Sequence, residues 1–163
     1  MKTYSIWKDY QGINYPRLEE NKKVDVLIIG GGITGVSCLY HLNKMNLKVM
    51  LVEQNKLGMS ITGNSTGKLT PLQNDLLANI RKIDENKASL YLKSQLEAID
   101  LVTKIIKKEK IDCDLVKCPS YLYTNKDDEI EKLKDLKFFL RHHQLTINEK
   151  EPPLVINKYS IVY

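Results

Sequence analysis

The chain has 163 residues, of which 42% are hydrophobic and 28% charged, a composition typical of a folded domain rather than a disordered segment. Its formal net charge is +5, from 25 Lys and Arg against 20 Asp and Glu. Basic residues alternate with acids, as in Lys107-Lys108-Glu109-Lys110, which argues against a nucleic-acid-binding stripe.

The cysteines and the hydrophobic runs exclude several further classes of protein. The three cysteines, Cys38, Cys113 and Cys118, are odd in number and form no C-x-x-C pair, so neither a disulfide framework nor a metal site is expected. We expect Cys38 to be a small core residue, and Cys113 and Cys118 to be core or partly buried thiols. The apolar run 24–29 is too short for a signal peptide or a membrane span. These observations favour a cytoplasmic protein.

The first part of the chain predicts a β-α-β unit. Residues 1–22 lack periodicity and are expected to form an extended leader. The apolar run Val24–Ile29 predicts a parallel strand buried on both faces. Helical spacing then predicts a helix over Ile33–Met45, closed by Asn46 as a left-handed cap. Lys48–Val52 predicts a second buried strand.

The rest of the chain adds mainly helices. Residues 57–71 are rich in Gly, Ser and Thr and predict an ordered loop. Apolar periodicity predicts helices over 75–86, 87–110 and 127–142, and short strands over 120–124, 155–156 and 161–162. The expected fold class is therefore α/β, with a Rossmann-like β-α-β core and additional helices.

A glycine motif connects the first strand to the first helix. It reads Gly30-x-Gly32-x-x-Gly35, which is the dinucleotide-binding fingerprint in its expected context. The first glycine permits the tight turn, the second lets the backbone approach a pyrophosphate, and the third brings the helix close to the strands. The N–H groups of Gly32, Ile33 and Thr34 open the helix, whose positive end favours phosphates.

An acidic residue completes the motif. Glu53 follows the second strand, where a carboxylate accepts hydrogen bonds from the adenosine ribose, and Gln54 stands beside it. The same unit serves FAD and NAD. The position of the motif near the start of the chain and the loop that soon follows Glu53 favour FAD. A glycine-rich turn of another α/β unit, with Glu53 as a surface acid, is the structural alternative.

These residues carry a family resemblance. The stretch 24–35 together with Val49-x-Leu51-Val52-Glu53 resembles the start of FAD-dependent oxidoreductases of the D-amino-acid oxidase type. Bacterial members with a similar leader are the nearest in pattern, and some of them carry a C-terminal Rieske domain. No such cluster is expected here, because Cys-x-His is absent. The loop after Glu53 is similar to their second FAD-contacting segment, which implies four more site residues: Gly63, Ser65, Thr66 and Lys68.

The resemblance implies a function. Residues 23–163 would be the N-terminal portion of an FAD-binding domain, in an enzyme that oxidises a C–N bond of an amine or amino acid by hydride transfer to FAD. Such enzymes are usually more than twice as long, which implies a truncated chain or a partner chain. Two alternatives stay open: a non-catalytic nucleotide-binding fragment and an NAD-dependent dehydrogenase domain. The sequence does not indicate the substrate, the catalytic residues, the electron acceptor or the oligomeric state.

Overall fold

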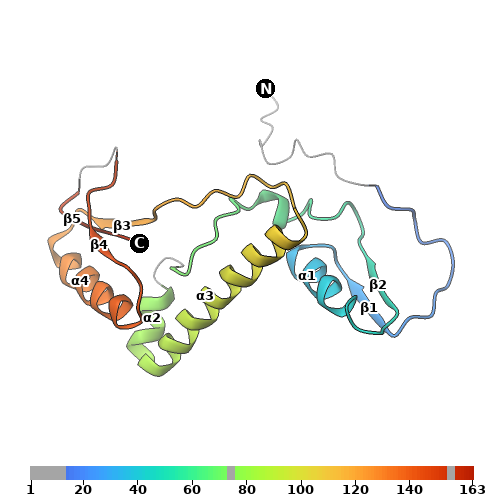
Figure 1. Cartoon of the computed structure of the whole chain (residues 1–163), viewed down its shortest axis with the longest axis horizontal. Helices are drawn as coiled ribbons and strands as arrows, with labels where there is room; N and C mark the ends of the chain where they lie inside the picture. The colour runs from blue at the N-terminus through green and yellow to red at the C-terminus, as the bar shows by residue number, and fades with distance from the viewer. Residues whose placement is uncertain (1–13, 73–75, 154–156) are drawn as a thin grey trace. The chain divides into compact units, whose positions relative to one another are not determined.

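A computed structural model describes residues 14–72, 76–153 and 157–163 (Figure 1). The chain divides into two compact units, residues 1–68 and residues 69–163. We call them unit 1 and unit 2 and describe each by itself. No helix in the described ranges is long and apolar enough to cross a membrane.

Unit 1 contains the predicted β-α-β unit. β1 (Val26–Ile29) pairs in parallel with β2 (Val49–Val52), in a register that sets Val26 beside Val49 and Ile29 beside Val52. The connecting helix, α1 (Ile33–Leu42), packs on both strands. A short 3-10 helix, η2 (Thr62–Asn64), lies in the loop that follows β2. The predicted order of strand, helix and strand is confirmed.

Two details predicted for unit 1 are wrong. β1 is not buried on both faces, since Leu27 is 51% and Ile29 82% exposed. α1 packs on the face of β1 that carries Val26 and Ile28. No element in the described part of unit 1 covers the opposite face, which carries Leu27 and Ile29. The helix also ends at Leu42 rather than Met45, because the Leu42 carbonyl accepts the N–H of Met45 in a turn. Asn46 is not among the non-glycine residues with positive φ in the described ranges.

The cysteines were predicted to be core or partly buried residues, and this is also wrong. Cys38 is exposed on α1, a helix with no fully buried residue. Cys113 and Cys118 are exposed as well, because they lie in the irregular segment 111–119, whose side chains are all exposed.

In its described residues, unit 2 combines three helices with a small antiparallel sheet. The helices are α2 (Leu76–Ile83), α3 (Glu85–Lys108) and α4 (Asp127–His142), and the strands are β3 (Tyr121–Thr124), β4 (Asn148–Glu149) and β5 (Tyr159–Val162). The strand order is β3-β5-β4. The core joins the helices to the sheet through Leu72, Leu77, Ala88, Leu92, Phe139, Leu140, Ile147 and Ile161.

The sequence located most elements of unit 2. α4 has the predicted bounds, while α3 begins earlier than predicted because the side chain of Asp84 caps it by accepting the N–H of Lys87. β4 was missed because its two residues are polar. The predicted strand at 155–156 lies outside the described residues.

Candidate cofactor site

The turn between β1 and α1 is built around close backbone contacts. Gly30 has φ of +105°, a conformation that residues with side chains rarely adopt, and its N–H donates to the Val52 carbonyl at 2.8 Å. A Cβ atom placed on Gly35 would lie 1.9 Å from the Gly30 carbonyl oxygen. The chain can therefore turn sharply from strand to helix only with glycine at these two positions.

Glu53 is fastened to this turn. One of its carboxylate oxygens accepts the N–H of Asn55 at 2.9 Å, and the other accepts the N–H of Gly31 at 2.7 Å. These two hydrogen bonds, with that from Asn55 the stronger influence, lower the pKa of the Glu53 carboxyl from its ordinary value. Glu53 is thus held as an anion at the carboxyl end of β2, with lone pairs left for a further donor.

The first turn of α1 presents backbone donors. The N–H of Val36 makes the first helical hydrogen bond, to the Gly32 carbonyl. The N–H of Ile33 donates to the Thr62 hydroxyl at 3.0 Å. Within the described part of the chain, no acceptor takes the N–H groups of Gly32 and Thr34. Free donors at the positive end of a helix suit a phosphate, so the geometry fits the pyrophosphate of a dinucleotide.

Two residues that pack on the glycine turn, Leu57 and Thr62, were not among the predicted site residues. A Cβ atom on Gly31 would lie 2.2 Å from the Leu57 side chain, and the Gly31 carbonyl accepts the N–H of Gly58 at 2.9 Å. The Thr62 hydroxyl accepts the N–H of Ile33. The segment 57–62 therefore packs against the glycine turn. The third consecutive glycine and the hydroxyl-rich loop were the available signals.

The structure brings some predicted site residues together and leaves others apart. Gly63 lies in η2, where a Cβ atom would lie 2.5 Å from the Gly58 carbonyl oxygen. Gln54 is exposed directly after Glu53. Ser65, Thr66 and Lys68 are also exposed, and in the described ranges no hydrogen bond joins them to the glycine turn. Their assignment stays a prediction.

A groove of about 980 Å³ runs beside Glu53 in unit 1. Its inner wall consists of β2, the residues 53–57 that follow it, and Leu39 of α1. Residues 14–20 and Lys22, from the end of the predicted leader, form the opposite wall. We call it the β2 groove. Its volume falls within the range of about 300–1,000 Å³ that is common for small-molecule sites.

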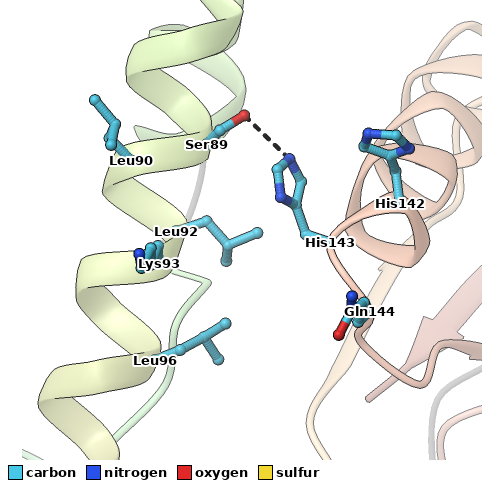
Figure 2. A pocket seen from close by; sticks show the side chains of 8 residues that line it. All are labelled: Ser89, Leu90, Leu92, Lys93, Leu96, His142, His143 and Gln144. Atoms are coloured by element: carbon cyan, nitrogen blue, oxygen red, sulfur yellow. Dashed lines mark hydrogen bonds between the residues drawn. The ribbon is translucent and has the colours of Figure 1, made fainter.

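A second cavity, of about 470 Å³, lies between α3 and α4 of unit 2 (Figure 2). His143 reaches from the end of α4 toward Ser89 on α3, with its Nε2 3.0 Å from the Ser89 hydroxyl. The Ser89 hydroxyl donates its proton to the Glu85 carbonyl, so it accepts from the His143 ring. No carboxylate of the described residues bonds to that ring. This pair ties two helices together and lacks the arrangement of a nucleophile with its base.

Comparison with known proteins agrees with the geometry. The model of the family described as "DAO: FAD dependent oxidoreductase" matches residues 25–155. The chain is 35% identical over 132 residues to YhfW of Bacillus subtilis, named as a Rieske 2Fe-2S iron-sulfur protein, covering 79% of this chain and 26% of YhfW. It is 27% identical over 101 residues to gamma-glutamylputrescine oxidoreductase of Escherichia coli, covering 61% of this chain and 24% of that protein.

A solved structure shares the fold. The crystal structure of glycine oxidase from Geobacillus kaustophilus superimposes with a TM-score of 0.61 at 18% sequence identity. The match covers 85% of this chain and 38% of glycine oxidase. The chain thus spans between about a quarter and two fifths of the length of these three proteins.

Proposed function

The chain belongs to the family of FAD-dependent oxidoreductases, and from this premise we propose that its β1–α1–β2 unit holds the adenosine and pyrophosphate of FAD. The observation that carries the proposal is the pairing of two features at one turn. The N–H groups of Gly32 and Thr34 have no acceptor in the described residues, and Glu53 is fixed beside them by the N–H of Gly31. Donors for phosphate and an acceptor for ribose thus stand at adjacent positions.

We assign a role to each part of the site. The glycines at 30, 32 and 35 shape the turn, and the N–H groups of Gly32 and Thr34 hold the pyrophosphate. The N–H of Ile33, which the sequence predicted to be a third phosphate donor, is instead taken by the Thr62 hydroxyl. Glu53, with Gln54 next to it, accepts the ribose hydroxyls. Gly63, Ser65, Thr66 and Lys68 belong to the loop proposed to contact the flavin half. In this assignment residues 1–22 are the leader and 23–163 the N-terminal portion of the FAD-binding domain.

The reaction that we propose is oxidation of a C–N bond in an amine or amino acid. FAD supplies the group that accepts the hydride when it is bound. The names of two similar proteins, gamma-glutamylputrescine oxidoreductase and glycine oxidase, support a small amine or amino-acid substrate. Because the chain spans only part of these proteins, we propose that further residues, in the same polypeptide or in a partner, complete the flavin pocket. The free thiols of Cys38, Cys113 and Cys118 support a cytoplasmic location.

A second candidate uses the same contacts, which lie in the β1–α1–β2 unit and the loop that follows it. A nucleotide-binding module without turnover would need only the β1–α1–β2 unit. This module and the oxidoreductase share the same site and differ only in catalysis.

Titration with FAD, FMN and NAD tests the proposal. The purified chain is expected to bind FAD with a change in flavin fluorescence, to bind NAD more weakly, and to lose FAD on Gly32→Val. A Cβ atom at Gly32 would lie 3.3 Å from the Thr62 hydroxyl, so a valine side chain would crowd the start of α1, where the pyrophosphate is proposed to bind. Tighter binding of NAD than of FAD would overturn the proposal. Retention of FAD by Gly32→Val would show that the cradle is misassigned.

A further inference from the structure

The β2 groove has two walls of different origin. The inner wall is formed by β2 and by Glu53, which belongs to the proposed ribose site. The outer wall is the leader segment 14–20, which the β-α-β fold does not require. Figure 1 shows this segment in blue as a long loop that leads into β1. A nucleotide that contacts Glu53 from this side would lie between the two walls.

The leader offers unused apolar surface to such a ligand. Tyr15 lines the groove, yet 65% of its surface is exposed. An aromatic ring that is this exposed makes few packing contacts within the protein. A flat ring stacked on it would bury its surface and add stacking energy. Nucleobases are such rings, and they stack on aromatic side chains in many binding sites.

One cation of the groove is available to a ligand. The groove is lined by three acids, Glu19, Glu20 and Glu53, of which Glu20 pairs with Lys22 at 2.6 Å and Glu53 accepts two backbone N–H groups. Arg17 also lines the groove, and it forms no ion pair with any residue in the described ranges. Its guanidinium is therefore available to a phosphate, the partner that its planar donor geometry suits.

We propose that the leader segment 14–20 is the outer wall of the adenosine half-site, where Tyr15 covers the adenine ring and Arg17 adds positive charge beside the phosphates. This inference rests on the proposed function and extends it to a segment outside the β-α-β unit. It commits to one occupant, the adenosine diphosphate half of FAD. It also assigns the leader a role in distinguishing FAD from FMN, which lacks that half.

The test compares FAD, FMN and ADP as ligands of the full chain. ADP, titrated by calorimetry, reports on the adenosine half alone, while flavin fluorescence reports on FAD and FMN. The variants are Tyr15→Ala and Arg17→Gln. Their matched controls are Tyr123→Ala, a half-exposed tyrosine of unit 2, and Lys23→Gln, an exposed cation that is adjacent to the leader but does not line the groove. Thermal melting confirms that each variant is folded.

We expect Tyr15→Ala and Arg17→Gln to weaken FAD and ADP about fivefold or more, and to leave FMN and both controls within about twofold. If both variants bind ADP as tightly as the parent while Gly32→Val loses it, the cofactor site stands and the leader inference is wrong. If Arg17→Gln and Lys23→Gln lose affinity for ADP equally while Tyr15→Ala loses none, the effect comes from net charge alone. That result would also overturn the leader inference. A parent chain that binds neither FAD nor ADP would contradict the proposed function itself.

Discussion

The carboxylate of Glu53 accepts the N–H of Gly31 at 2.7 Å, and this hydrogen bond joins the end of β2 to the turn that follows β1. Gly31 also packs against Leu57, where a Cβ atom would lie 2.2 Å from the side chain. The acid proposed to bind ribose therefore shapes the turn proposed to bind phosphate. A change at Glu53 should alter both parts of the site.

Glu53→Gln is expected to weaken FAD roughly tenfold or more and FMN by less than about threefold. The amide keeps only one acceptor oxygen for the N–H groups of Gly31 and Asn55, and its NH₂ group accepts nothing. Fluorescence titration with both flavins measures the effect, and Glu97→Gln on α3 is the control for loss of one negative charge. Equal losses for the two flavins would contradict the ribose assignment.

Gly35→Ala is expected to destabilise unit 1 by roughly 1–3 kcal/mol. The new Cβ atom would lie 1.9 Å from the Gly30 carbonyl oxygen, which is backbone and can yield only if the helix moves away from the strand. Gly32→Ala is the matched comparison, because its nearest neighbour is the Thr62 hydroxyl at 3.3 Å. Denaturant unfolding, and amide exchange measured in α1, should both show a larger loss of stability for Gly35→Ala than for Gly32→Ala. A larger loss for Gly32→Ala would contradict this account.

Thr62→Val is expected to expose the Ile33 amide to faster hydrogen exchange. Valine has nearly the shape of threonine but no oxygen to accept the Ile33 N–H, a contact worth about 0.5–1.5 kcal/mol. Exchange measured residue by residue checks this result, with the exposed Thr146→Val as the control. Unchanged protection at Ile33 would show that Thr62 does not hold the first turn of α1.

The sequence predicted the parts of the fold that depend on local pattern. The apolar runs located β1 and β2, and the periodicity of 127–142 located α4, because these signals lie within each segment. It failed where the outcome depends on neighbours. Leu27 and Cys38 read as core residues, yet no described element of unit 1 covers them. Whether an apolar side chain is buried depends on a partner surface that the local pattern does not encode.

The candidate site shows the same division. The glycines at 30, 32 and 35 were recognisable from their spacing. The contact of Thr62 with Ile33 joins residues that are 29 positions apart, and no spacing rule predicts it. The fingerprint therefore identified the turn but not the loop that closes over it.

Acid should weaken the Glu53 contacts. The folded-state pKa of this carboxyl lies below its ordinary value of 4.5, so its contribution to stability is fully present above that pH and is lost as pH falls through the lowered pKa. Glu129, through Thr124 and Lys126, and Glu149, through Lys137 and Tyr159, also have lowered pKa values and therefore respond to acid in the same direction. Amide exchange at Gly31 and Asn55 from pH 6 to about pH 3 isolates the local effect.

Glu53→Gln serves as the reference for that experiment. The variant has no carboxyl at this position, so its protection at Gly31 should vary less with pH than that of the parent. Parallel pH profiles for the two proteins would mean that Glu53 does not control the order of the turn.

The last prediction concerns turnover by these 163 residues tested alone. We expect the FAD-loaded chain to show little or no oxidation of amines or amino acids. Catalysis needs a substrate held against the flavin in a dry pocket, with its reacting C–H aligned. The β2 groove borders the adenosine side of the proposed site, and the cavity of unit 2 is lined by a histidine–serine pair that ties two helices together.

An anaerobic assay checks this expectation. The FAD-loaded chain is mixed with a panel of amino acids and primary and secondary amines, and loss of the flavin absorbance is followed over time. A longer homologue such as gamma-glutamylputrescine oxidoreductase is the positive control, given its name as an oxidoreductase. Rapid bleaching by any member of the panel would mean that this chain already contains a complete substrate site, formed by residues other than those assigned above. Slow bleaching that is the same with and without substrate is the expected result, because it reports only the background reduction of bound flavin.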